Sequence, residues 1–219
     1  PFPQVLLERR SWRRFGRRAL TLNELSTVLG LTWGTQQWMH LRPELACPLK
    51  TSPSGGASHS LEVYVVARRV RDLTAGVYRY APDAHGLVRI GDVWPHGALR
   101  ESLGGQEWAC EAGAIFFMTA VFPRMQWKYK FARAYRAVLL EAGHFCQTFC
   151  LVSTWMNLAP FCTAALADTL IERHLRIDGI AESVIYAMGI GPRPARAAWA
   201  PWPDHAPLPE RSAPAHQRR

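Results

Sequence analysis

The stretch PSGGASHSLEVYVV, residues 53–66, indicates the fold most directly. Its first part is a glycine-rich loop, and from Leu61 to Arg68 apolar residues alternate with polar or aromatic ones. This alternation predicts a strand with one covered face. Two adjacent glycines let a backbone approach a flat ligand closely, and free amides can bond its heteroatoms. An ordinary flexible loop is the alternative, and neither a Walker loop nor a dinucleotide fingerprint is present.

Helices and strands alternate around this stretch. Thr21 and Glu24 form a capping box that predicts a helix start. Hydrophobic periodicity predicts a hairpin over 76–80 and 87–90, a central strand over 113–122, a long helix over 132–157, a short helix over 165–175 and a last strand over 184–190. Residues 43–60 are expected as a loop because they are rich in Pro, Gly and Ser. Together these elements predict an α+β fold with a mixed sheet.

The composition narrows the class of protein. The 219 residues are 48% hydrophobic and 20% charged, so the chain is not disordered as a whole, and a net charge of +9 favours anionic partners. No apolar run approaches the roughly 18 residues of a membrane span. Five cysteines without a CxxC pair argue against a disulfide framework and a structural zinc knuckle, which favours a cytoplasmic setting. We expect one domain over 1–191 and a Pro/Arg-rich arm over 192–219.

The N-terminal run contains Arg9, Ser11 and Arg13. Arginine donates bidentate hydrogen bonds and serine supplies a hydroxyl, so these side chains can converge on a phosphate. The alternatives are a solvated basic arm and a nucleic-acid contact.

Lys128 and Tyr129 are adjacent and form a candidate pair for proton transfer, since burial or charge can move both pKa values toward neutrality. A surface lysine beside a packed tyrosine is the ordinary alternative. Glu141 and His144 have the E-x-x-H spacing of carboxylate-bridged metal sites, but no second such helix is present and we expect no metal. Cys146 and Cys150, one helical turn apart, are expected as core residues. Among the nine tryptophans, Trp33, Trp38 and Trp127 are candidates to line a pocket.

The order of these motifs resembles the nitroreductase-like flavoproteins, and within them the SagB-type branch, the azoline dehydrogenases of thiazole- and oxazole-forming pathways. The resemblance covers roughly residues 8–193. It rests on R-x-S-x-R-x-F from Arg9, LTLNELS at 20–26, PSGGA before LEVYVV, LTAGVYRY at 73–80, Lys128-Tyr129, Tyr135-Arg136, LEAGH at 140–144, Gln147, and the segment from Asp178-Gly179 to Glu182. Two segments depart from the branch, Ser58-His59-Ser60 and Asn157-Leu158, and both are expected to reshape the substrate side.

The resemblance implies a mainly antiparallel sheet flanked by helices and a homodimer with two FMN molecules at the subunit interface. It places the FMN phosphate on Arg9, Ser11 and Arg13, joined by a late arginine, Arg193 or Arg196. It also implies a backbone amide from residues 159–162 near the flavin. The remaining FMN contacts that it implies are Pro53, Ser54, Gly55, Gly56, Ala57 and Gln147.

The function implied is oxidation of a thiazoline or oxazoline, bound to a peptide or carrier, to the aromatic heterocycle. Lys128 would act as the base and Tyr129 as its proton partner, with oxygen as the electron acceptor. We expect no nucleic-acid or membrane partner. Two alternatives remain: an NAD(P)H-dependent nitro- or quinone reductase of the same fold, and a basic nucleic-acid-binding module without catalysis.

Overall fold

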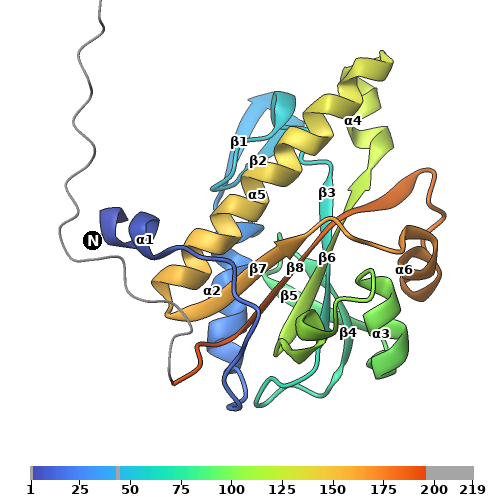
Figure 1. Ribbon diagram of the computed structural model, residues 1–219. Coiled ribbons are helices and arrows are strands. Elements are labelled where there is room, and N and C mark those ends of the chain that lie inside the picture. Colours follow the sequence, from blue (N-terminus) through green and yellow to red (C-terminus); the bar gives the residue numbers. More distant parts are fainter. Residues whose placement is uncertain (1, 43–44, 196–219) are drawn as a thin grey trace, which may run out of the picture.

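A six-stranded sheet organises the computed structural model, which describes residues 2–42 and 45–195 (Figure 1). Its strand order is β5-β4-β3-β6-β8-β7, and every pairing between these strands is antiparallel. The strands are β3 (Leu61–Ala67), β4 (Gly76–Ala81), β5 (Gly86–Gly91), β6 (Ala114–Val121), β7 (Leu158–Thr163) and β8 (Glu182–Pro192). The predicted α+β class, the 76–90 hairpin and the central apolar strand are confirmed.

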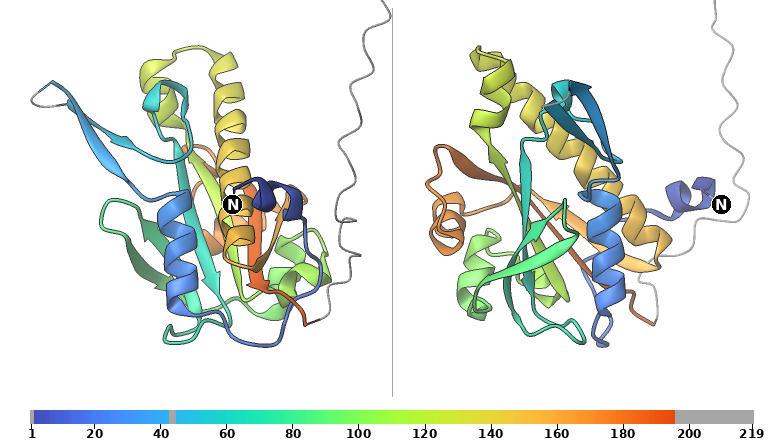
Figure 2. Two further views of the ribbon diagram at one scale, coloured as in Figure 1. Left: turned by 90° about the vertical axis from the view of Figure 1, so that its left-hand side faces the viewer. Right: turned by 180° about the vertical axis from the view of Figure 1, so that it is seen from behind.

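Helices cover both faces of the sheet (Figure 2). On one face lie α2 (Leu22–Thr32) and α5 (Tyr135–Trp155), and on the other lie α3 (His96–Ser102) and α6 (Asp168–Leu175). All seven residues of β3 are therefore buried, and the prediction of one covered face was wrong. Tyr64 packs in the second core, while Glu62 is buried because arginines pair with it.

The helix boundaries follow local chemistry. The Thr21–Glu24 capping box at the start of α2 is confirmed, with both reciprocal hydrogen bonds formed. The long helix α5 begins three residues later than predicted, because residues 132–134 form a 3-10 turn. It ends before Asn157, whose φ of 57° lies in the left-handed region that stops a helix.

A second, two-stranded sheet corrects the prediction that residues 43–60 are a loop. Here β1 (Gln37–Arg42) pairs antiparallel with β2 (Leu45–Leu49), and the hairpin projects from the body beside α5 (Figure 2). Pro48 lies within β2, opposite Trp38. Proline is tolerated there because each strand of a two-stranded ribbon has one free edge that needs no donor. Residues 55–57 form a 3-10 turn rather than open loop.

Three helices were not predicted: α3, described above, and two more. α1 (Phe2–Glu8) packs beside α5, and α4 (Phe122–Lys128) starts with Pro123 in its first turn and ends at Lys128. None of the helices in the described ranges is long and apolar enough to cross a bilayer. Most of the predicted Pro/Arg-rich arm, from residue 196, lies outside the described residues.

The cysteines also differ from expectation. A disulfide joins Cys146 on α5 to Cys162 on β7, whereas the sequence argued against disulfides. Cys150 Sγ lies 3.4 Å from Cys162 Sγ. The 16-residue separation of the bonded pair hides this link from any local pattern. Cys146 and Cys150 are nevertheless buried in the main core, as predicted.

Candidate active site

The glycine-rich loop lies along the middle and beginning of α5. Ser52 Oγ is 2.6 Å from Thr148 Oγ1, and the Pro53 carbonyl lies 3.2 Å from His144 Nδ1. Nearer the helix start, a Cβ added at Gly55 would lie 3.4 Å from that of Ala137. The chain therefore runs antiparallel to α5 for about three helical turns, which fixes the loop.

Glu141 anchors this loop from within α5. Its side chain is 1% exposed, and its Oε2 accepts hydrogen bonds from Ser54 Oγ at 2.9 Å and from Ser60 Oγ at 3.1 Å. Burial raises the pKa of Glu141, and the two hydroxyl donors oppose that shift. Oε1 has no hydrogen-bond partner among the described residues. The E-x-x-H spacing thus supplies a buried loop anchor, and Glu141 was missed in that role.

The loop brings the predicted proton-transfer pair together with the glycines. Lys128 Nζ donates to the Gly56 carbonyl at 3.0 Å and lies 6.0 Å from the Tyr129 ring centroid. Gly56 has φ of 62°, and a Cβ there would lie 2.6 Å from Tyr129 Oη and 2.8 Å from Lys128 Nζ. Only glycine therefore admits both side chains at this point of the loop.

A cavity of about 1060 Å³, which we call the Lys128 cavity, opens beside this contact. Its walls are the β1–β2 hairpin, the loop and α4, so three segments distant in the sequence enclose it. The lining residues are Met39, Ala46, Cys47, Pro48, Gly56, Ala57, Ser58, Pro123, Arg124, Trp127 and Lys128. Of the three candidate tryptophans, Trp127 lines this cavity, Trp38 is exposed on the hairpin, and Trp33 is in the core.

The N-terminal arginines lie at the other end of α5. Trp12 is buried and its amide donates to the Pro160 carbonyl on β7 at 2.9 Å, which leaves Ser11 and Arg13 exposed on either side. Arg13 lies over the Trp108 ring, 5.3 Å from its centroid. Within residues 2–42 and 45–195, the side chains of Arg9, Ser11 and Arg13 have no hydrogen-bond or ion-pair partner. These donors are available for an anion.

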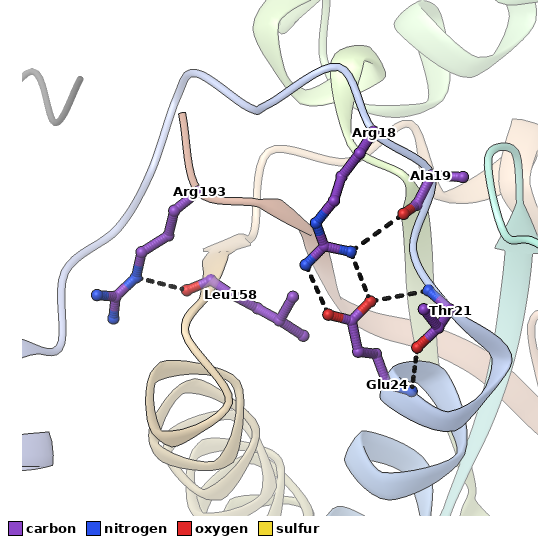
Figure 3. Close-up of polar contacts among 6 residues, drawn as sticks. All are labelled: Arg18, Ala19, Thr21, Glu24, Leu158 and Arg193. Atoms are coloured by element: carbon purple, nitrogen blue, oxygen red, sulfur yellow. Dashed lines mark hydrogen bonds and ion pairs between the residues drawn. The ribbon is translucent and has the colours of Figure 1, made fainter. Parts of the chain in front are cut away.

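Arg193 lies at the C-terminal end of α5 (Figure 3). Its Nε donates to the Leu158 carbonyl at 3.2 Å and its Nη2 to the Thr154 carbonyl at 3.3 Å. Its Nη1 is 3.7 Å from Glu8, so this arginine already binds protein groups. Figure 3 also shows Arg18 paired with Glu24, the capping residue of α2. Unlike Arg9 and Arg13, Arg18 therefore already has an anionic partner.

The predicted site residues thus form two groups along one helix. The loop, Lys128 and Tyr129 lie at its first half, and Arg193 and the N-terminal arginines lie near its end, about 25 Å away between Ala137 and Thr154. Gln147 is exposed on α5 between them, one turn after the exposed Gly143. Residues 159–162 belong to strand β7, against which the N-terminal segment packs.

Comparisons with known proteins agree with this architecture. The model of the Nitroreductase family matches residues 6–192. A protein of Methanocaldococcus jannaschii named as a nitroreductase is 33% identical over 173 residues, covering 79% of this chain and 83% of that protein. The trifolitoxin-processing protein TfxB of Rhizobium leguminosarum bv. trifolii is 30% identical over 142 residues, 63% of this chain and 38% of TfxB.

Three solved structures are similar in fold. A protein from Anabaena variabilis described as a nitroreductase has a TM-score of 0.70 and 28% identity, covering 77% of this chain. In the Escherichia coli microcin synthetase McbBCD complex with truncated pro-MccB17, one chain has a TM-score of 0.68 and 22% identity, covering 81% of this chain and 66% of that one. A Desulfovibrio desulfuricans protein described as a nitroreductase, in complex with FMN, has a TM-score of 0.59 and 17% identity, covering 92% of each chain.

This chain spans about a third of the Anabaena chain, 34%, and 38% of TfxB, so those proteins contain further segments. The family match, by contrast, extends over the whole six-stranded sheet, α5 and both groups of candidate residues except Arg193, which follows the last matched residue. The chain belongs to the nitroreductase family.

Proposed function

We propose that this chain is an FMN-dependent dehydrogenase of the SagB-type branch. Its substrate is a thiazoline or oxazoline held on a peptide or carrier, and its product is the aromatic heterocycle. The family supports the oxidoreductase class. A peptide substrate is supported by the similarity to the trifolitoxin-processing protein and by the fold shared with a chain of the microcin synthetase complex.

One observation carries this proposal: Lys128 and Tyr129 meet the glycine-rich loop at the wall of a large cavity. The pair and Gly56 are 72 residues apart in the sequence, yet Lys128 Nζ bonds the Gly56 carbonyl directly. Two proton-transfer groups, a glycine that permits close approach and a cavity with an apolar wall are together what a bound heterocycle requires.

The residues present fit FMN. Its phosphate needs several convergent donors, and Arg9, Ser11 and Arg13 are unpartnered within the described chain. Gln147, exposed on α5, and residues 53–57 would contact the ring system, and Arg193 would add N–H groups beyond those it already donates. A second subunit packed on α5 would bring the two groups of residues closer than they lie in one chain.

FMN, when bound, supplies a two-electron acceptor. The chain contributes alignment and proton handling. Lys128 takes the proton from the substrate α-carbon, and Tyr129 orients the lysine or receives that proton. Lys128 is exposed in the single chain, so exclusion of water from its amine requires cover from the substrate or from the partner subunit. Molecular oxygen is the proposed final acceptor.

The experiment is a double substitution, Lys128→Ala with Tyr129→Phe. We expect the variant to lose turnover of a thiazoline-containing peptide. Its FMN content should be unchanged, because neither side chain is among the residues proposed to bind the FMN phosphate. The matched control is Lys130→Ala, the same truncation of a lysine two residues away that lines a separate groove between α4 and α5. Turnover retained in the first variant would overturn the catalytic assignment.

A further inference from the structure

A second cavity, of about 530 Å³, lies across the loop from the Lys128 cavity, and we call it the charged cavity. The end of the β1–β2 hairpin, the segment after the loop, strands β3 to β5 and α4 enclose it. Its charged and titratable lining residues are Lys50, His59, Glu62, Arg79, Asp83 and Arg124, with Tyr80 beside them. The two cavities share Pro48, Ser58 and Arg124, so a ligand in one can extend into the other.

Most of the charges in this cavity are already paired. Glu62 is buried and accepts from Arg79 at 3.0 Å and from Arg124 at 2.5 Å. Asp83 accepts from the Thr35 hydroxyl at 2.7 Å. Lys50, in contrast, has no ion-pair partner within the described residues. Among the residues that line the cavity, three cations face two carboxylates, which leaves one positive charge in excess.

The ammonium group of Lys50 lies in an environment that disfavours its charge. Burial lowers the pKa of Lys50, since the ammonium has lost part of its hydration, and Glu62, Asp83 and Glu141 compensate from beyond ion-pair distance. Nothing in the fold requires a lysine here, because its amine contacts no protein anion. A ligand with one negative charge would replace the lost hydration.

His59 provides a second, independent indication. The side chain is 9% exposed, lines the cavity, and its Nδ1 has no hydrogen-bond partner among the described residues. Burial, followed by the Lys50 charge, lowers the pKa of His59 to about 4, so the ring is neutral at pH 7. Buried polar atoms are nearly always bonded in folded proteins, so an orphan on a cavity wall marks a place for a ligand atom.

We propose that the charged cavity binds a single carboxylate group of the substrate, through an ion pair with Lys50 and a hydrogen bond from His59. In the tautomer that carries hydrogen on Nδ1, the imidazole donates to one carboxylate oxygen while Lys50 binds the other. The Glu62–Arg79–Arg124 cluster forms the opposite wall and keeps its own pairing.

A carboxylate fits better than a phosphate. One uncompensated cation balances one negative charge, whereas a phosphate dianion would need a second free cation, and both arginines are bound to Glu62. On a peptide, such a carboxylate belongs to an acidic side chain near the residue in the Lys128 cavity. The binding itself does not depend on the proposed oxidation.

The test is a titration of the purified chain followed by NMR, with acetyl-glutamate amide as the probe and acetyl-glutamine amide as its neutral match. We expect the glutamate probe to bind at about millimolar affinity, with a shift of the His59 ring nitrogens, and the glutamine probe about tenfold more weakly. Lys50→Met should weaken glutamate binding about tenfold while keeping the aliphatic stem. Lys130→Met, outside the cavity, should change it less than about twofold.

Equal binding of both probes, or unchanged glutamate binding in Lys50→Met, would overturn the proposal. So would inorganic phosphate binding more tightly than the glutamate probe, since that would show two available cations. If Lys50→Met unfolds, His59→Ala serves as the second variant and should weaken glutamate binding in the same direction. Succinate, a free dicarboxylate, tests whether the bound carboxylate comes from a peptide. If succinate bound as tightly as the glutamate probe, recognition of a peptide side chain would be contradicted.

Discussion

Glu141 shows how a single buried carboxylate holds the loop of the candidate site. Ser54 and Ser60, 87 and 81 residues away in the chain, both donate to its Oε2. Loss of that oxygen leaves the hydroxyl hydrogens of Ser54 and Ser60 without their acceptor. The carboxylate is also costly, because its charge is desolvated. The side chain is therefore expected to matter for its oxygen atom rather than for its charge.

Glu141→Ala should lower the free energy of unfolding by about 1–3 kcal/mol, whereas Glu141→Gln, which keeps an acceptor oxygen, should stay close to the wild type. Burial raises the pKa of Glu141 from 4.5, so the folded chain holds this proton more tightly than the unfolded chain. The stability contribution of Glu141 thus falls as pH rises from 4.5 through the folded pKa. Urea unfolding between pH 4 and 8 should show that the free energy of unfolding declines less in Glu141→Gln than in the wild type. An identical decline in both proteins would contradict this.

At the scale of elements, α5 connects the parts of the site. The loop bonds its first half, β7 is joined to it by the Cys146–Cys162 disulfide, and Arg193 bonds carbonyls at its end. The exposed Gln147 lies between these attachments. Displacement of α5 relative to β7 would separate the arginine group from the loop group, so the cross-link is expected to contribute to the site as well as to stability.

Cys162→Ala removes the disulfide with Cys146, and it also removes the thiol nearest to Cys150, so that Cys150 cannot form a substitute link to β7. Without reductant, its free energy of unfolding should be about 3 kcal/mol below that of the wild type, the effect expected of a cross-link over this separation. Reductant should bring the wild type close to the variant. Cys47→Ser, outside the cluster, is the control and should match the wild type. Peptide mapping that finds Cys146 and Cys162 unlinked would contradict the prediction.

The elements with strong local patterns were predictable from the sequence. Alternation and continuous apolar runs located β3 and β6, and Thr21 with Glu24 located the start of α2. The β1–β2 hairpin was not predicted, because Pro48 and the nearby Pro, Gly and Ser residues are typical of loops. No local pattern in the sequence indicates that this segment pairs with itself and projects beside α5. α4 was missed because Pro123 suggests a turn, although proline suits the first turn of a helix.

The candidate site was predictable only where local sequence motifs mark its residues. Motif order located the glycine loop, Lys128 and Tyr129, which the fold brings into contact. The charged cavity was not predictable, because Lys50, His59 and Arg124 meet only after β2, β3 and α4 are assembled. The disulfide likewise depends on α5 packing on β7.

At the scale of the whole molecule, the outer side of α5 exposes several large apolar side chains among its polar residues. Tyr135, Leu139 and Leu140 are exposed in its first half, alongside the exposed Gly143 and Gln147. Exposed apolar side chains grouped together and rimmed by polar residues are typical of a protein–protein interface. We propose that two copies of the chain pack through this face, as the resemblance to dimeric flavoproteins implies, and thereby cover Lys128.

Sedimentation should give the mass of two chains, and Leu140→Glu should give that of one. The substituted side chain is exposed, so the monomer should keep its secondary structure. Ile180→Glu, at a more exposed position on the loop before β8, is the control and should leave the dimer intact. Wild-type protein that sediments as a monomer at micromolar concentration would remove this interface.

The most direct test of the proposed function is the visible spectrum of the purified protein during anaerobic titration, first with a thiazoline-containing peptide and separately with NADPH. We predict flavin absorption bands that bleach with the thiazoline and remain with NADPH, and that return when oxygen is admitted. Bleaching by NADPH alone would assign the chain to the nitro- or quinone reductases. A colourless protein that does not bind added FMN would contradict both functions and revive the nucleic-acid alternative.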